Sequence, residues 1–176
     1  MKIRLDKIGA EPLRWQEEVS IPAASLDRTQ LLELGEVSWS GQIWLESPGY
    51  RLKAAFSYAQ SIACDRCLTP LTKSVAGDVQ LILVANAPQP MEDEVELAAE
   101  DLEILYLEGD ELDLEKLLLE QLQLNVPMRA ICKEDCQGLC PDCGINRNLK
   151  NCSCDEARID PRWEALRGLK DKDSKA

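Results

Sequence analysis

The sequence of 176 residues contains no histidine. A Ser/His/Asp or Cys/His catalytic arrangement is therefore excluded, and no metal site in this chain can use imidazole. A Gly-rich phosphate-binding loop is also missing. The carboxylates of residues 92–120 are too dispersed to argue for an acid/base pair. From these absences we expect no enzymatic activity and no small-molecule substrate.

Long apolar runs are absent as well. No run of about 18 apolar residues occurs, so the sequence predicts no membrane-spanning helix and no membrane partner. Residues 1–8 alternate between charged and apolar side chains and do not have the pattern of a signal peptide. We therefore expect a cytoplasmic protein, or a protein of the plastid stroma if the source is a plant. In such a reducing compartment, clustered cysteines favour metal binding or redox chemistry over structural disulfides.

Basic side chains are scarce in one part of the chain. Residues 86–125 hold 1 basic and 13 acidic side chains, whereas residues 1–85 and 126–176 have net charges of −1 and +1. The formal charge of −12 therefore comes from one stretch, which repels phosphate and makes the chain as a whole a poor nucleic-acid binder. We interpret this stretch either as a solvated linker or as a surface that holds a basic partner protein.

The first 85 residues have the pattern of an antiparallel β domain, flat or closed into a small barrel. Apolar and polar positions alternate over residues 13–21, 37–45 and 50–58, and a short apolar strand follows at 79–85. A short helix is predicted to interrupt the strands at about residues 25–34. Four tryptophans are expected to pack in the core rather than to stack on nucleic-acid bases, namely Trp15, Trp39, Trp44 and Trp163.

An acidic connection and a helix are predicted to follow this β domain. Residues 86–112 form the connection, with a possible strand at 102–107. Residues 113–126 form the helix, because Asp113 suits the N-cap position and leucines follow at helical spacing. Pro127 then ends the helix.

The last predicted part is a cysteine-rich metal-binding segment over residues 127–170. It ends in a short helix after Asp160-Pro161. The fold class expected for the whole chain is therefore α+β, with a sheet or barrel-like domain followed by a helix and a zinc-binding segment. Because residues 132–154 have little apolar content, burial alone cannot order them, whereas a structural zinc contributes about 10–16 kcal/mol of apparent binding free energy.

Eight cysteines occur in four short pairs, and six of them lie within 23 residues near the C-terminus. One pair lies in a Cys-Pro-Asp-Cys-Gly knuckle, a tight turn that points two thiolates at one ion. Its most economical partners are the next two cysteines, because a short loop costs little entropy to close. The two predicted four-thiolate sites are Cys140, Cys143, Cys152 and Cys154, and Cys64, Cys67, Cys132 and Cys136.

Zinc is the metal that this ligand set favours, with one or two ions per chain. The same knuckle also occurs in rubredoxin-type iron sites, so iron remains an alternative, although no electron-transfer partner motif is visible. Cys64 and Cys67 alone are a possible dithiol redox pair, with Arg66 as the one visible cation beside them. Against this interpretation, the pair ends a strand pattern rather than opening a helix.

The order of these motifs resembles one known family. Its signature here runs through Asn125-Val-Pro-Met, Cys132, Glu134-Asp-Cys136, Gly138-Leu-Cys-Pro-Asp-Cys-Gly144, Asn148, Cys152-Ser-Cys154 and Asp160-Pro-Arg162. With the upstream Cys64-Asp-Arg-Cys67, this order is similar to that of the YceD-like large ribosomal RNA subunit accumulation proteins of bacteria and plastids.

The resemblance implies a non-catalytic, metal-binding factor in the accumulation or processing of large-subunit (23S) ribosomal RNA. It implies a ribosomal protein or pre-ribosomal particle as partner, with direct or indirect contact to that RNA. From the residues alone, two other classes stay open. One is a thiol-based redox or electron-transfer protein, and the other is a zinc-dependent nucleic-acid-binding regulator.

Overall fold

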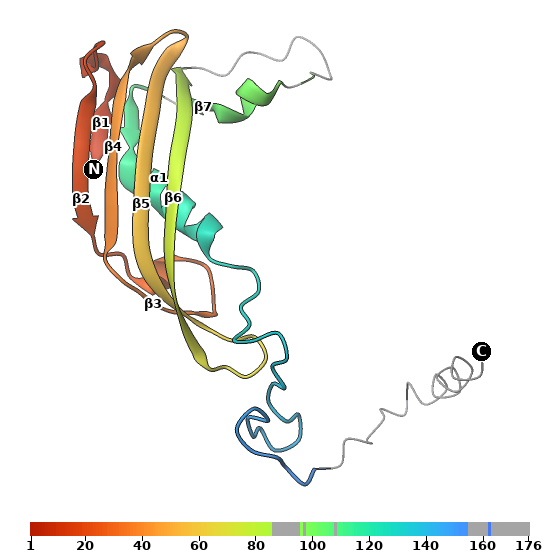
Figure 1. Cartoon of the computed structure of the whole chain (residues 1–176). Helices are drawn as coiled ribbons and strands as arrows, with labels where there is room; N and C mark the ends of the chain where they lie inside the picture. The colour runs from red at the N-terminus through yellow and green to blue at the C-terminus, as the bar shows by residue number, and fades with distance from the viewer. Residues whose placement is uncertain (86–95, 97, 108, 155–161, 163–176) are drawn as a thin grey trace.

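The computed structural model describes residues 1–85, 96, 98–107, 109–154 and 162. Its elements form a curved sheet with one α-helix behind it, and the C-terminal cysteines lie beyond one end of that sheet (Figure 1). The strands are β1 (Lys2–Arg4), β2 (Leu13–Val19), β3 (Leu31–Leu34), β4 (Val37–Glu46), β5 (Gly49–Ala63), β6 (Pro70–Ala85), β7 (Ile104–Leu107) and β8 (Glu111–Asp113). The helices are the 3₁₀ turns η1 (Leu5–Lys7), η2 (Ala23–Ser25) and η3 (Ala99–Glu103), and α1 (Leu114–Asn125).

The main sheet has the strand order β2-β4-β5-β6-β7, with β3 also paired to β5. The period-2 alternation predicted this sheet, and its centre is the long β5–β6 hairpin, whose register runs from Tyr50↔Leu83 to Ala63↔Pro70. The fold class is therefore confirmed as α+β. One pair departs from the antiparallel expectation, because β7 runs parallel to β6. A parallel neighbour needs a long crossover connection, and the chain between Ala85 and Ile104 supplies its length.

The helix predicted at about residues 25–34 is wrong. The structure has a single 3₁₀ turn, η2, and then the strand β3, which carries an irregularity between Leu31 and Glu33. The amide of Gly35 donates to the carbonyl of Ala59 at 2.8 Å, and the amide of Ala63 donates to the carbonyl of Gln30 at the same distance. Pairing with the long strand β5 thus outweighs the local helical preference of this leucine-rich stretch.

Helix α1 begins where the sequence predicts. The Asp113 carboxylate accepts hydrogen bonds from the amides of Glu115 at 3.1 Å and Lys116 at 3.3 Å, so Asp113 is the N-cap. The strand before it, β8, pairs with β1 in a two-stranded sheet, which the sequence did not reveal. The leucines on one face of the helix are buried, namely Leu114, Leu117, Leu118 and Leu122.

We expect Asp113→Ala to lower the free energy of unfolding by about 1 kcal/mol, since two amides at the start of α1 lose their acceptor. Asp110→Ala is the matched control, because Asp110 is an exposed neighbour outside the helix. Urea denaturation of both variants measures the difference. Equal midpoints for the two variants would show that the cap does not stabilise the fold.

The core lies between the concave face of the sheet and α1 (Figure 1). Trp15 and Trp39 are 8% and 2% exposed and belong to this core, as predicted. Trp44 is only half-buried and donates its indole N–H to Glu46 at 2.8 Å, so the core prediction is wrong for Trp44. Trp163 and the predicted helix after Asp160-Pro161 lie outside the described residues.

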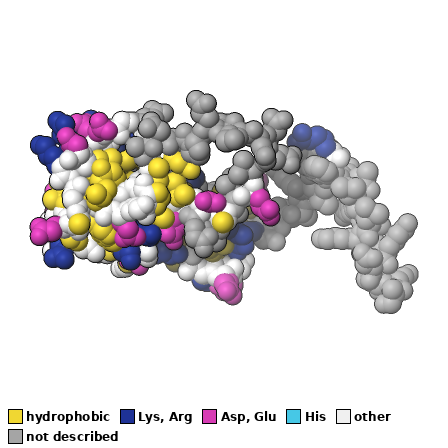
Figure 2. Space-filling model, turned by 90° about the horizontal axis from the view of Figure 1, so that it is seen from above, with side chains coloured by type: hydrophobic (Ala, Val, Ile, Leu, Met, Phe, Trp, Pro, Cys, Tyr) yellow, Lys and Arg dark blue, Asp and Glu magenta, His cyan; other side chains and the backbone are white. Residues whose placement is uncertain are grey.

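The end of the sheet farthest from the cysteines exposes some apolar surface. Figure 2 views this end from above and shows hydrophobic side chains between charged ones. Leu13 begins β2 and Leu45 lies near the end of β4, and they are 46% and 50% exposed. No described helix has both the length and the apolar character that crossing a bilayer requires.

Candidate metal centres

The loop between β5 and β6 forms the first knuckle. The amide of Cys64 donates to the carbonyl of Thr69 at 3.0 Å, and the amide of Leu68 donates back to the carbonyl of Cys64 at 2.9 Å. Leu68 has a φ of +59°, a left-handed conformation that bends the chain sharply after Cys67. The hairpin therefore ends in a tight turn that carries Cys64 and Cys67, which are both buried.

Asp65, one of the two residues between these cysteines, binds the chain segment that carries the other two ligands of the site. Asp65 forms two hydrogen bonds with Ala130: its amide donates to the Ala130 carbonyl at 2.8 Å, and its carboxylate accepts from the Ala130 amide at 2.7 Å. This clamp fixes the chain two residues before Cys132. The entropic cost of closing the long loop between Cys67 and Cys132 is thus reduced, because the folded hairpin already offers a docking point.

The four sulfur atoms of the first centre (Cys64, Cys67, Cys132 and Cys136) lie within 4.8 Å of one another. Two of the separations are 4.0 Å, between the Sγ atoms of Cys64 and Cys136, and 3.7 Å, between those of Cys67 and Cys132. A tetrahedron with metal–sulfur distances of about 2.3 Å has edges of about 3.8 Å. The sulfur positions therefore fit a metal ion bound tetrahedrally by four thiolates.

Hydrogen-bond donors around the first centre favour thiolates. The amide of Cys132 donates to Cys64 Sγ at 3.4 Å, and Asn148 Nδ2 donates to Cys136 Sγ at 3.3 Å. Burial raises the pKa of the Cys64 thiol, but amide donors outweigh it and bring that pKa down to about 6. The pKa of Cys136 is likewise lowered, because the Asn148 donor and a backbone donor outweigh burial. Cys132, next to Cys136, has its pKa raised to about 12, a cost that a bound dication would reverse.

The guanidinium of Arg66 has a structural role. It donates to the carbonyls of Glu134 at 3.1 Å and Cys136 at 3.0 Å. It therefore ties residues 134–136 to the hairpin loop. Each thiol of the Cys64–Cys67 pair also faces a cysteine of the distant segment, a four-sulfur arrangement rather than an isolated dithiol.

The second centre consists of Cys140, Cys143, Cys152 and Cys154, whose sulfur atoms also lie within 4.8 Å of one another. The amide of Gly144 donates to the carbonyl of Cys140 at 2.9 Å, and the amide of Cys140 donates to the carbonyl of Ile145 at 2.8 Å. Gly144 has a φ of +72°, which explains the glycine at the end of the knuckle motif. This turn repeats the bonding of the first knuckle.

In the second centre, as in the first, the pKa of one thiol is lowered and that of another is raised. Backbone donors from Cys143 and Asp142 lower the pKa of Cys140 to about 6. The neighbouring Cys143 raises the pKa of Cys154 to about 12. Cys140 is buried, whereas Cys143 is exposed, so the second centre lies nearer the surface than the first.

The eight cysteines thus come together in the two groups that the sequence predicted, and all eight are free thiols. Among the described residues, no carboxylate joins either group. The donor set and the sulfur spacing fit zinc, and equally fit iron, as a four-coordinate ion. Such an ion would cross-link chain segments that have little core of their own. Sequence reasoning missed the contact of Asp65 with Ala130 and that of Asn148 with Cys136. Their one signal is their position inside or between the cysteine pairs.

Gly138 allows the two segments to approach closely. It has a φ of +71°, and a Cβ atom at this position would lie 3.0 Å from the carbonyl oxygen of Arg66. The adjacent Leu139 amide donates to that same carbonyl at 2.9 Å. A side chain at residue 138 would therefore push the cysteine segment away from the hairpin loop.

We expect Gly138→Ala to weaken metal binding at the first centre by roughly 5- to 30-fold, the equivalent of a left-handed penalty of about 1–2 kcal/mol. Gly9→Ala is the control, because nothing lies within 4 Å of a Cβ atom at that glycine. Metal retention against a competing chelator measures the effect. If both variants retain metal equally, the close approach at Gly138 is not required.

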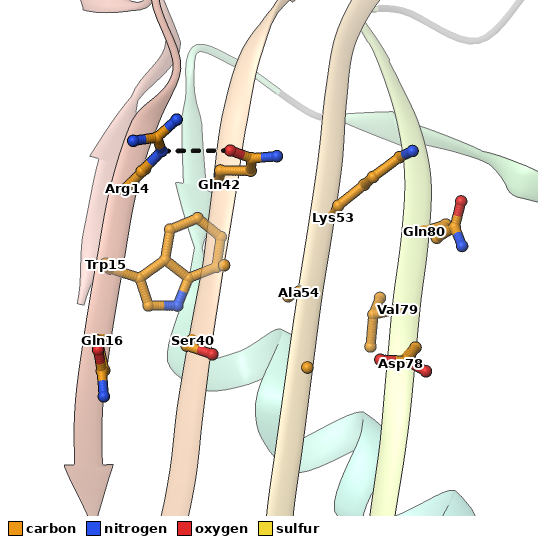
Figure 3. A pocket seen from close by; sticks show the side chains of 12 residues that line it. Arg14, Trp15, Gln16, Ser40, Gln42, Lys53, Ala54, Asp78, Val79 and Gln80 are labelled. Carbon is orange, nitrogen blue, oxygen red and sulfur yellow. Dashed lines mark hydrogen bonds between the residues drawn. The ribbon is translucent and has the colours of Figure 1, made fainter.

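A separate cavity of about 630 Å³ lies on the sheet away from both centres (Figure 3). Arg14, Gln42, Lys53 and Gln80 form a polar row across four strands at one register, and Arg14 donates to Gln42 at 3.3 Å. Asp78 is the single carboxylate of its lining, so the cavity holds no carboxylate pair. We treat it as part of the polar outer face of the sheet.

Comparison with known proteins finds a family that matches most of the chain. A model of the family described as large ribosomal RNA subunit accumulation protein YceD matches residues 52–170, which include all eight cysteines. No solved structure matches the chain. The family match therefore includes the β5–β6 hairpin and both centres.

Individual relatives also match the chain. An uncharacterized protein of Mycobacterium tuberculosis is 35% identical over 103 residues, which cover 58% of this chain and 47% of the relative. Two relatives are described as large ribosomal RNA subunit accumulation protein YCED homolog 1, chloroplastic. The one from Arabidopsis thaliana is 31% identical over 65 residues, covering 37% of this chain and 20% of the relative. The one from Zea mays is 23% identical over 163 residues, covering 78% and 55%.

The chain spans about half the length of the first curated relatives that it matches. The family match, by contrast, extends over more than half of the chain itself and contains the complete set of candidate metal ligands. The chain therefore belongs to the YceD family of large ribosomal RNA subunit accumulation proteins.

Proposed function

We propose that the protein is a non-catalytic, zinc-binding factor that supports the accumulation or processing of large-subunit ribosomal RNA. One observation carries this proposal: the family match over residues 52–170 contains both four-thiolate centres, including the hairpin loop that carries Cys64 and Cys67. The function of the family supplies the link to ribosomal RNA. The geometry of the two four-thiolate centres supports a bound four-coordinate metal ion.

The closed shape of the centres supports a structural role for the ions. Each centre has four protein ligands, whereas catalytic zinc sites keep one position open for water or substrate. The first centre connects the β5–β6 loop to residues 130–136, and the second closes the chain between residues 140 and 154. Zinc fits this role better than iron, because a structural cross-link requires no redox change. The thiol-redox alternative has less support, since all eight thiols are used in two tetrahedral sets.

The acidic part of the chain supports a basic protein partner, such as a ribosomal protein. A cleft of about 470 Å³ lies between β7, β8 and α1. Leu105 and Leu107 give it an apolar wall, and the carboxylates of Glu111 and Glu120 are exposed at it together with one lysine, Lys116. A partner segment that combines lysine or arginine with apolar side chains would complement this surface.

Direct contact with RNA is the second candidate mode of action. Arg129, Lys133 and Lys150 are exposed near the cysteine centres, which supports a phosphate-facing surface at that end. Lys133 lies 3.6 Å from the Asp135 carboxylate, so this positive charge is partly balanced. We therefore favour the protein partner over direct RNA contact.

Depletion of the protein in its own cells tests the ribosomal role. We expect the ratio of large-subunit to small-subunit ribosomal RNA to fall, and the wild-type chain to restore it. A chain with Cys64 and Cys67 both replaced by serine should fail to restore the ratio. An unchanged ratio after depletion would contradict the proposed function, whatever metal the protein binds.

A further inference from the structure

The two cysteine centres are joined by direct hydrogen bonds. Residues 144–151 form a loop whose ends are fixed by Cys143 and Cys152 of the second centre. Two asparagines of this loop, Asn146 and Asn148, reach the first centre. The loop of one centre therefore supplies outer contacts to the ligands of the other.

Asn148 has the most direct connection. Its Nδ2 atom donates to Cys136 Sγ at 3.3 Å, and its Oδ1 atom accepts from the amide of Gln137 at 2.9 Å. Nδ2 is also held by Asn146 Oδ1 at 2.9 Å. The side chain is thus oriented from both ends, and its N–H points at a sulfur that carries negative charge when it binds metal.

Asn146 connects the loop to a second ligand through Thr69. Asn146 Nδ2 donates to Thr69 Oγ1 at 3.4 Å, and Thr69 Oγ1 lies 3.2 Å from Cys67 Sγ. The Thr69 hydroxyl can therefore accept from Asn146 while it donates to a Cys67 thiolate. The backbone reinforces this arrangement, since the amide of Arg147 donates to the carbonyl of Gly138 at 3.0 Å.

We propose that metal binding at the two centres is positively coupled through Asn146 and Asn148. This inference rests on the metal-binding part of the proposed function and is independent of the ribosomal part. An ion at the second centre fixes the loop ends and so holds both asparagines against the first centre. An ion at the first centre creates the thiolates that these donors stabilise. Linkage requires each centre to raise the affinity of the other by the same factor.

The test is a zinc titration of the full, reduced, metal-free chain against a competing chelator. Single-centre constants come from Cys140→Ser with Cys143→Ser, and from Cys64→Ser with Cys67→Ser. In the wild type, the overall two-ion constant is expected to exceed the product of these two constants by roughly 10- to 100-fold, the usual effect of outer-shell contacts. With Asn146→Ala and Asn148→Ala together, this ratio should fall close to one.

Two further variants sharpen the result. Asn148→Asp keeps the acceptor for the Gln137 amide but replaces the donor at Cys136 with an anion, so it should also abolish the coupling. Asn151→Ala is the control, because Asn151 is exposed in the same segment, and it should keep the wild-type ratio. If the double asparagine variant does not bind two ions, Asn148→Asp decides the question.

The outcomes separate this inference from the proposed function. Two bound ions with a ratio of one in the wild type would overturn the coupling and leave the metal sites intact. A ratio that persists in the asparagine variants would overturn the role of the loop. A wild-type chain that binds no metal would overturn both the coupling and the zinc part of the proposed function.

Discussion

A chain in which Cys64 and Cys67 are both replaced by serine is expected to keep its sheet but to lose the order of residues 130–139. Only three of these residues are buried, namely Ala130, Cys136 and Gly138. Ordering a backbone costs about 1–2 kcal/mol per residue, which such limited burial does not offset. The ion at the first centre would therefore supply most of the stabilisation, within the range of about 10–16 kcal/mol for structural zinc.

Hydrogen exchange measured in excess zinc tests this expectation. Amides of residues 130–139 should exchange at least about 100-fold faster in the variant, while the central amides of β4 and β5 keep their wild-type rates. The matched variant, Cys140→Ser with Cys143→Ser, should affect mainly residues 137–154 and retain the Asp65–Ala130 clamp. Identical exchange patterns in the two variants would contradict the division into two centres with different roles.

Neutralising the acidic stretch is expected to weaken capture of a basic partner by roughly 100-fold. The change converts six carboxylates to amides, at Glu92, Asp93, Glu94, Glu96, Glu100 and Asp101. At about 0.5 kcal/mol for each exposed ion pair, six pairs contribute about 3 kcal/mol. Residues 92–95 lie outside the described residues, so this expectation rests on the charge of the sequence.

Affinity capture from cell extract at two salt concentrations measures this effect. Wild-type capture should fall as salt rises, and the neutralised chain should show little further loss. The comparison variant reverses charge at Arg147, Lys150 and Arg158. If neutralisation leaves protein capture unchanged while charge reversal abolishes RNA association, direct RNA contact is the better account.

Local chemistry explains which parts of the fold were predictable from the sequence. The start of α1 was predictable because the N-cap Asp113 bonds to amides only two or three residues further on. The strand around Phe56 was predictable because its apolar side chains alternate with polar ones and lie on the buried face. The parallel strand β7 and the pair β1–β8 depend on partners far along the chain. Leu31 lies in a strand instead of the expected helix for the same reason.

The candidate centres follow the same division. The knuckle spacing and the number of cysteines predicted the two ligand groups, since a short loop between ligands favours one ion. The contacts that position these ligands join separate parts of the chain, so the spacing of the cysteines did not predict them. Asp65 meets Ala130 only because the folded hairpin carries the first knuckle to the C-terminal segment. Asn148 meets Cys136 only because the loop after Cys143 folds back, with the Arg147 amide donating to the Gly138 carbonyl.

The metal content of the full chain, purified under reducing conditions without added metal, tests the central claim most directly. Elemental analysis combined with native mass spectrometry should give two zinc ions per chain and a colourless protein. Chelation should release both ions and make all eight thiols reactive, with loss of order in residues 130–154. A metal-free chain with eight reactive thiols and the same hydrogen-exchange protection as before chelation would contradict the account.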